Sequence, residues 1–286
     1  MTIVFGLLSA FSYGYADFVG ALAAKKIRAV AVTTYSFSFG LVIAMILSLF
    51  VGADYQRETI VLSIYAGICS AIAISCLYAA LALGPISIVS PLTAVISAIV
   101  PVMFDVFSGQ ELSSFVAIAV VLILIAVVLV GFVPGEKVQL PSVPAVLYSI
   151  AAGLGFSGIF LFLDATASDS GLASLVVMRA IGLLLLLAGL LLLWLKGSKQ
   201  KQFIERLSNL KLFGLVLLAG FGDVLGNVGF LVATRTGSLT VASVLTALYP
   251  VGTILLARIF LKERIALSQS FGIALAIGAC ALLALG

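Results

Sequence analysis

Long apolar runs follow one another along this chain, and only very short polar breaks separate them. Of the 286 residues, 63% are hydrophobic and 9% are charged, whereas soluble domains carry about 25% charged residues. Each crossing of a bilayer needs roughly 20 apolar residues in a helix, while a transmembrane β-barrel would show short alternating segments. The sequence therefore predicts an all-α polytopic membrane protein. The ten expected transmembrane helices are 3–23, 30–51, 60–83, 87–107, 113–133, 144–164, 171–195, 211–233, 238–261 and 266–286.

The pattern of residues 84–131 recurs in residues 237–286, and each copy finishes in a long aliphatic run. A hydrophobic chain built from two related halves is typical of transporters that bind their solute between those halves. The matched positions are Gly84 with Gly237, Ser90 with Ser243, Leu92-Thr93-Ala94 with Leu245-Thr246-Ala247, Phe107 with Phe260 and, after a slip of one residue, Glu111 with Glu263.

The chain divides near its centre, at residues 133–144, where prolines and a Gly135-Glu136-Lys137 turn interrupt the apolar pattern. Five predicted helices precede this break and five follow it. Because five is odd, the second half enters the membrane from the opposite side, which makes the two copies an inverted 5+5 repeat. We expect the first five-helix repeat at 1–134 and the second at 142–286.

Lysine and arginine are distributed unequally between the two faces of the membrane. Twelve lie in the loops after helices 1, 3, 5, 7 and 9, and two, Arg57 and Arg235, lie in the other loops. Under the positive-inside rule this bias places both termini outside the cytoplasm. The twelve are Lys25, Lys26, Arg28, Lys137, Lys196, Lys199, Lys201, Arg206, Lys211, Arg258, Lys262 and Arg264.

No metal or cofactor is expected. Cys69, Cys76 and Cys280 lie in apolar runs without a CxxC pattern, so we interpret them as small core residues. The sequence contains no histidine, which excludes any mechanism that needs imidazole. The isoelectric point near 9.0 is explained by cationic membrane loops rather than by nucleic-acid binding.

Several motifs stand at characteristic places in the predicted helices. They are Asp17-Phe18-Val19-Gly20, Met178-Arg179, Gly222-Asp223-Val224-Leu225-Gly226-Asn227, Leu248-Tyr249-Pro250, Ala257-Arg258 and Lys262-Glu263-Arg264. With ten helices and an inverted repeat, the whole chain resembles the drug/metabolite transporter (DMT) superfamily in its EamA-type branch. This resemblance implies a bacterial inner-membrane carrier that works by alternating access and often exports metabolites or amino acids. Several members of that group have cytoplasmic termini, so the orientation stays open.

Three ionisable residues, Asp17, Arg179 and Asp223, lie inside predicted helices. A charge at the bilayer centre costs at least ~2.5–3.5 kcal/mol, so such residues are candidates for function. At about 1.5 Å per residue, Arg179 lies about 12 Å, and Asp223 about 15 Å, from the same membrane face. The two sit at nearly one depth on consecutive helices, which makes a salt bridge between them geometrically feasible.

Two interpretations of these charges remain open. In the first, they line a polar cavity, where Arg179 holds a substrate carboxylate or Asp223 exchanges a proton once Arg179 moves away. In the second, Arg179 and Asp223 form a structural pair between helices 7 and 8. Asp17 is expected either to reach the cavity or Arg179, or to extend toward Lys25 and Lys26.

Asn227 lies one turn beyond Asp223 on the same helix face and is a further candidate for the cavity. The neighbouring Gly222, Gly226 and Gly229 form a stripe of small residues, which favours close helix packing.

Prolines mark helices 4 and 9 as candidate walls of the transport pathway. Helix 4 contains Pro91 and Pro101, and its repeat partner contains Pro250. Interrupted helices at corresponding places in two halves point to a binding site. The polar residues expected near the pathway are Ser90 and Thr93 on helix 4, Ser243, Thr246 and Tyr249 on helix 9, and Tyr13, Tyr15 and Tyr78 as weaker candidates. Asp105, Glu111 and Glu263 lie at helix ends and are expected to cap loops.

Other function classes fit the sequence less well. Gly155-Phe156-Ser157-Gly158 matches the GxSG pattern of intramembrane serine proteases, but those need a histidine. An ATP-driven pump would need a Walker A motif, which is absent from the sequence. A channel or a scaffold without transport activity remains an alternative to a carrier.

The sequence and this resemblance together predict a secondary-active transporter with a small-molecule substrate, surrounded by the lipid bilayer, as a monomer or homodimer. The inner (plasma) membrane is the location that the resemblance implies. Export of a small metabolite or amino acid is the first interpretation, with proton coupling as an option. Uptake or facilitated passage of a small, possibly cationic, solute is the alternative.

Overall fold

Helices make up nearly all of the computed structural model, which describes residues 1–24, 26–27, 29–84, 86–131, 141–195, 209–261 and 266–285. Eight of the spans are long and apolar enough to cross a membrane, and two shorter apolar helices, 114–130 and 267–283, complete the ten that the sequence predicts. The helices are α1 (Thr2–Ala24), α2 (Ala29–Val51), α3 (Arg57–Leu83), α4 (Ile86–Phe107), α5 (Ser114–Gly131), α6 (Val143–Asp164), α7 (Ala173–Leu195), α9 (Leu210–Arg235), α10 (Leu239–Thr246), α11 (Tyr249–Leu261) and α12 (Leu267–Leu285).

The ninth predicted helix, 238–261, forms one membrane span, Leu239–Leu256, but a two-residue turn interrupts it, as its proline predicts. It consists of α10 and α11, which are separated after Thr246. Pro250 gives the physical reason, because in a continuous helix its ring would clash with the carbonyl of residue 246, and it has no N–H to donate. In contrast, α4 remains a single helix although Pro91 and Pro101 lie inside it. The interruption therefore occurs in the second half, and α4 does not share it.

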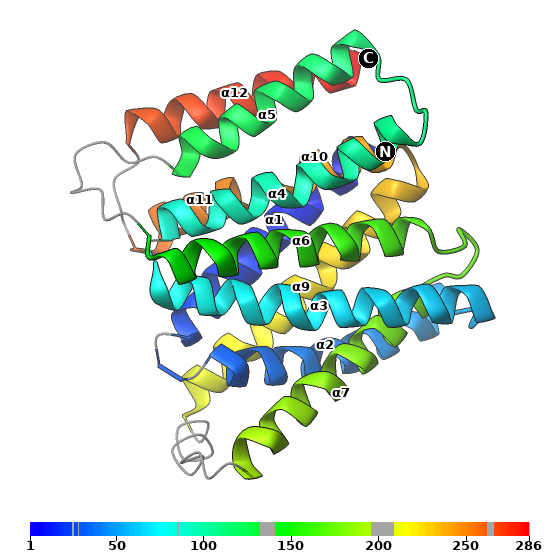
Figure 1. Cartoon of the computed structure of the whole chain (residues 1–286), viewed down its shortest axis with the longest axis vertical. Coiled ribbons are helices and arrows are strands. Elements are labelled where there is room, and N and C mark those ends of the chain that lie inside the picture. The colour runs from blue at the N-terminus through cyan, green and yellow to red at the C-terminus, as the bar shows by residue number, and fades with distance from the viewer. Residues whose placement is uncertain are drawn as a thin grey trace.

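The contacts between helices repeat in inverted order in the two halves. α1 packs extensively against α9, and the counterparts of these helices, α6 and α3, pack against each other in the same way. α5 packs on α12, and α2 packs on α7, so each of these pairs joins a helix to its own counterpart. In Figure 1 the α5–α12 pair lies at the top and α7 at the bottom, with α1, α3, α4 and α6 between them. Helices of the two halves therefore pack against one another throughout the bundle.

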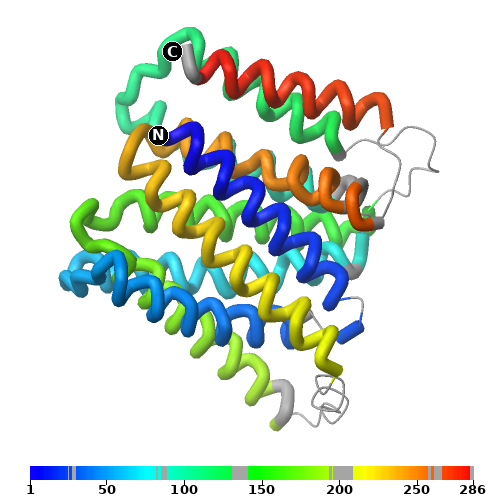
Figure 2. Tube along the Cα trace, turned by 180° about the vertical axis from the view of Figure 1, so that it is seen from behind, coloured from blue at the N-terminus to red at the C-terminus, as the bar shows by residue number. Residues whose placement is uncertain are grey.

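Both ends of the chain lie on the same side of the bundle, as ten crossings require (Figures 1 and 2). The cations that carry the orientation argument fall mostly outside the described residues, as does the centre of the chain at 132–140. The cations outside the described residues are Lys25, Arg28, Lys137, Lys196, Lys199, Lys201, Arg206, Lys262 and Arg264.

Loops from the two halves pair on the side of the bundle where the termini lie. The amide of Leu172, after α6, donates to the carbonyl of Gly52, after α2, at 2.9 Å. Arg235 at the end of α9 donates to the carbonyl of Gly171 at 2.9 Å. Asp105 of α4 accepts bonds from the amide and the hydroxyl of Thr240 at 2.8 and 2.7 Å, so it caps α10 as expected. Glu111 is exposed, and Glu263 lies outside the described residues.

The stripe of small residues on α9 packs closely against α1, as the sequence predicts. A Cβ atom at Gly226 would lie 2.7 Å from the Tyr13 ring, and one at Gly229 would lie 3.0 Å from the backbone of Ser9. The Ser9 hydroxyl also donates to the carbonyl of Gly226 at 2.7 Å. Close packing of α1 on α9 fixes where Tyr13 and the rest of α1 lie.

The GxSG pattern on α6 also serves packing. The Ser157 hydroxyl donates to the carbonyls of Gly153 at 2.9 Å and Ile96 at 3.2 Å. A Cβ at Gly155 would lie 2.8 Å from that of Ala73 on α3. Ser157 is thus bound to the backbone and buried between helices.

Gly14 allows α1 to approach α11, and its replacement tests this contact. A Cβ at Gly14 would lie 2.5 Å from the carbonyl oxygen of Tyr249 and 2.8 Å from the amide nitrogen of Thr253. Because both are backbone atoms, Gly14→Leu must push the helices apart, and we expect the free energy of unfolding to fall by about 1–3 kcal/mol or more. Thermal unfolding in detergent should show a lower midpoint. Gly189→Leu is the matched control, since nothing lies within 4 Å of a Cβ there; equal midpoints for the two variants would contradict this account of the interface.

Candidate functional site

An ion pair joins α7 to α9 in the interior of the bundle. Arg179 Nη1 contacts Asp223 Oδ2, so the ion pair that the matching depths predicted is present. Arg179 is 1% exposed, and its guanidinium carbon lies 4.6 Å from the centre of the Phe37 ring on α2. Its second terminal nitrogen, Nη2, has no hydrogen-bond partner among the described residues. Burial makes each charge dependent on the other, because an uncompensated charge is costly in such surroundings.

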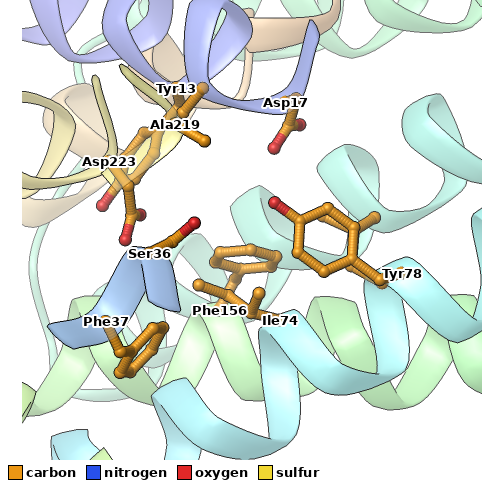
Figure 3. Close-up of a pocket in the computed structure, with 11 residues that line it drawn as sticks. Tyr13, Asp17, Ser36, Phe37, Ile74, Tyr78, Phe156, Ala219 and Asp223 are labelled. Carbon is orange, nitrogen blue, oxygen red and sulfur yellow. The ribbon is translucent and has the colours of Figure 1, made fainter. Parts of the chain in front are cut away.

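A pocket of about 350 Å³ lies beside this ion pair, between helices of both halves (Figure 3). A second volume of about 240 Å³ shares Tyr13, Asp17 and Phe156 with it, so we treat the two as one central cavity. The lining of the central cavity consists of Tyr13, Ala16, Asp17, Ser36, Phe37, Ile74, Leu77, Tyr78, Phe156, Phe160, Ala219, Asp223 and Tyr249.

Asp17 faces the central cavity from α1. No hydrogen bond or ion pair links its carboxylate to any other residue that the structure describes. Figure 3 shows its carboxylate and the Tyr78 hydroxyl pointing toward one another across the pocket, with Asp223 on the far side. Asp17 was expected to reach the cavity or Arg179, or to extend toward Lys25 and Lys26. In the structure it lines the cavity, and among the described residues it forms no ion pair with Arg179. The cavity therefore holds two carboxylates in different surroundings, one paired and one unpaired.

Five of the expected site residues line the central cavity: Tyr13, Asp17, Tyr78, Asp223 and Tyr249. Tyr249 begins α11 at the helix break, and its hydroxyl donates to the carbonyl of Ser90 on α4 at 3.2 Å. This hydrogen bond from the Tyr249 side chain to the α4 backbone therefore joins the two halves at the cavity. Arg179 is not among the lining residues of these two volumes and lies behind Asp223.

The remaining expected residues do not line these two volumes, and all of them except the partly exposed Tyr15 are buried. The hydroxyl of Thr93 donates to the carbonyl of Ser149 at 3.3 Å, and that of Ser243 donates to the carbonyl of Thr240 at 3.1 Å. Both hydroxyls therefore serve helix contacts. The Asn227 amide donates to the backbone carbonyl of Asp223 at 2.7 Å, while its own Oδ1 is buried without a partner among the described residues. The hydroxyl of Thr246, at the helix break, is likewise buried and unpartnered within the described ranges.

Sequence reasoning missed the aromatic and hydroxyl groups that α2 and α6 contribute. Ser36 and Phe37 come from α2, and Phe156 and Phe160 from α6. Phenylalanine in an apolar helix carries no signal of its own, because the side facing lipid and the side facing the bundle have similar composition. The GxSG pattern contained Phe156, but it pointed to Ser157.

Comparison with known proteins decides the family. The sequence profile of the EamA-like transporter family matches residues 1–132 and again residues 143–285, which together span nearly the whole chain. The chain belongs to the EamA-like transporter family. It is therefore a multi-pass membrane protein of a transporter family with a two-repeat architecture, which confirms the resemblance to the DMT superfamily and fits a transporter rather than an enzyme.

A solved crystal structure shares this fold. It matches with a TM-score of 0.73 over 99% of this chain and 96% of the other, at 14% sequence identity. At that identity the likeness supports the fold alone. A search of curated proteins gave no match.

Proposed function

We propose that the protein is a secondary-active transporter of the inner membrane that exports small metabolites or amino acids by alternating access, with proton coupling. The observation that carries this proposal is the central cavity, which residues of both halves enclose and which contains an unpaired carboxylate. Transporters built from inverted repeats bind their solutes near the midplane between the repeats, beside discontinuous helices. The break between α10 and α11, with Tyr249 at its edge, fits this arrangement.

We assign the solute-contacting role to Tyr13, Asp17, Asp223 and Tyr249, and a supporting role to Arg179, which fixes Asp223. The unpartnered oxygens of Asn227 and Thr246 are available to a solute or to water in another conformation. We keep three further residues in the proposed pathway because their hydrogen bonds hold the helices that border it. They are Ser90, Thr93 and Ser243. The two proposed repeats extend over 1–134 and 142–286, with both termini outside the cytoplasm.

Proton coupling fits Asp17 better than Asp223. Asp223 already has a cationic partner in Arg179, whereas Asp17 has none among the described residues. A buried carboxylate without a partner is stabilised either by a proton or by a bound cation. Exchange of one for the other at Asp17 would couple solute movement to protons without breaking the Arg179–Asp223 pair.

Uptake of a small cationic solute is the second candidate. The described lining residues of the cavity include two carboxylates and no lysine or arginine, which suits a cation in either direction of transport.

Cysteine accessibility tests whether the cavity lies on the solute path. Ser36 lines the cavity, so Ser36→Cys, in a background where Cys69, Cys76 and Cys280 are alanine, should react with a small cationic methanethiosulfonate. Alternating access predicts reaction from either side, in right-side-out and in inside-out vesicles. Gln110→Cys in an exposed loop is the positive control, and Gly189→Cys, with open space around it, is the control outside the cavity. Reaction no faster than that of Gly189→Cys would contradict a water-filled pathway, and reaction from one side alone would contradict alternating access.

A further inference from the structure

The central cavity has an uneven balance of charge. Arg179 neutralises Asp223 through the ion pair, and its position behind Asp223 keeps it out of the lining of the cavity. Asp17 reaches both volumes of the cavity and has no cationic partner among the described residues. With Asp17 ionised, the lining therefore carries one negative charge that no cation among the described residues neutralises.

Aromatic rings surround this carboxylate. Tyr13 and Phe156 line both volumes together with Asp17, and Tyr78 faces Asp17 across the larger one (Figure 3). Tyr249 closes the smaller volume. The faces of aromatic rings carry negative charge density and attract cations that lie within about 6 Å of the ring centre, most strongly where water is excluded.

The rest of the lining offers little to an anion. Arg179 is committed to Asp223 on one side and stacks on Phe37 on the other. Among the described residues no lysine or arginine lines the cavity, so a solute carboxylate there would face the carboxylates of Asp17 and Asp223. Little free space remains inside the pocket, which suits a small solute rather than a large one.

We propose that the transported solute is a small organic cation, an amine or a quaternary ammonium compound, whose charged nitrogen binds at Asp17 among the rings of Tyr13, Tyr78 and Phe156. This inference rests on the proposed transport function and names its substrate class. It assigns Asp17 as the counter-charge of the solute and gives the Arg179–Asp223 pair the role of holding α7 and α9 in place. A free carboxylate on the solute is not required for binding.

A matched set of probes tests the substrate class by binding alone. Leucinamide carries a cation without a carboxylate, leucine carries both, N-acetyl-leucine carries the anion alone, and N-acetyl-leucinamide is neutral. Tetramethylammonium tests a cation that cannot donate hydrogen bonds. We expect leucinamide and tetramethylammonium to raise the thermal unfolding midpoint of the full-length protein in detergent, and the two N-acetyl compounds to leave it unchanged.

The Asp17→Asn variant should bind the cations at least about tenfold more weakly, because it removes one member of a buried charge pair. Glu111→Gln, which removes a carboxylate from an exposed loop, should bind like the unmodified protein. Stronger binding of leucine or N-acetyl-leucine than of leucinamide, cation binding that survives in Asp17→Asn, or no response to either cation would each overturn the proposal.

Flux measurements distinguish a wrong substrate class from a wrong transport function. If reconstituted protein carries anions or neutral solutes and binds neither cation, the substrate class is wrong and the transporter function stands. If the cations bind through Asp17 but no solute crosses the membrane, the binding site stands and the transport function fails.

Discussion

Arg179→Met and Asp223→Asn are each expected to lower the free energy of unfolding by roughly 3–5 kcal/mol, because each change leaves the partner's charge buried and uncompensated. Both residues are buried, and Phe37 covers the guanidinium, so water is poorly placed to replace the lost partner. Because the pair is buried, we expect each single variant to lose stability as well as transport.

The double variant Arg179→Met/Asp223→Leu distinguishes the loss of stability from the loss of transport. Replacing a buried pair by apolar groups of similar size is often neutral for stability, so we expect the unfolding midpoint to return toward that of the unmodified protein. The difference between the double variant and the sum of the single variants Arg179→Met and Asp223→Leu measures the coupling of the two side chains. Thermal unfolding of purified protein in detergent gives all four values. Single variants as stable as the unmodified protein would contradict the assignment of a buried ion pair.

The helices and the depth of the charges could be predicted because both follow from distances along the chain. The length of an apolar run sets a span, and 1.5 Å per residue placed Arg179 and Asp223 at one level. The lateral direction of each side chain could not be predicted in the same way, because α2 and α6 are apolar around their whole circumference. Phe37 and Phe156 were therefore missed, and Asp17 kept several possible partners.

The ninth helix shows a second limit of sequence reasoning. A proline inside an apolar run predicts a disturbance, but Pro91 and Pro101 lie within a continuous α4, whereas a two-residue turn precedes the helix that contains Pro250. Local sequence does not distinguish these outcomes, since the partners of the freed backbone groups come from neighbouring helices.

Asp17→Asn should reduce transport about a hundredfold or more while leaving the fold intact. The carboxylate has no partner among the described residues, so its removal leaves no orphaned charge, and the amide has nearly the same shape. We also expect the variant to lose its response to a proton gradient, because no neighbouring group can take over the proton. The groups that face Asp17 from other helices are Tyr78, Tyr249 and the Asp223–Arg179 pair, and Tyr13 lies on its own helix. None of these offers a second unpaired carboxylate. An unfolding midpoint equal to that of the unmodified protein is the control for an intact fold.

Exchange-accelerated efflux tests the central claim most directly, that a solute crosses by binding in the cavity at Asp17. Proteoliposomes loaded with a mixture of metabolites that includes amines and amino acids would be diluted into buffer with or without the same mixture, and the released solutes identified by mass spectrometry. We predict that at least one solute leaves liposomes with the unmodified protein, or with Glu111→Gln, faster when the mixture is present outside. Liposomes with Asp17→Asn should release this solute no faster than protein-free liposomes. Efflux from Asp17→Asn at the rate of the unmodified protein, or efflux that does not respond to external solute, would contradict the account.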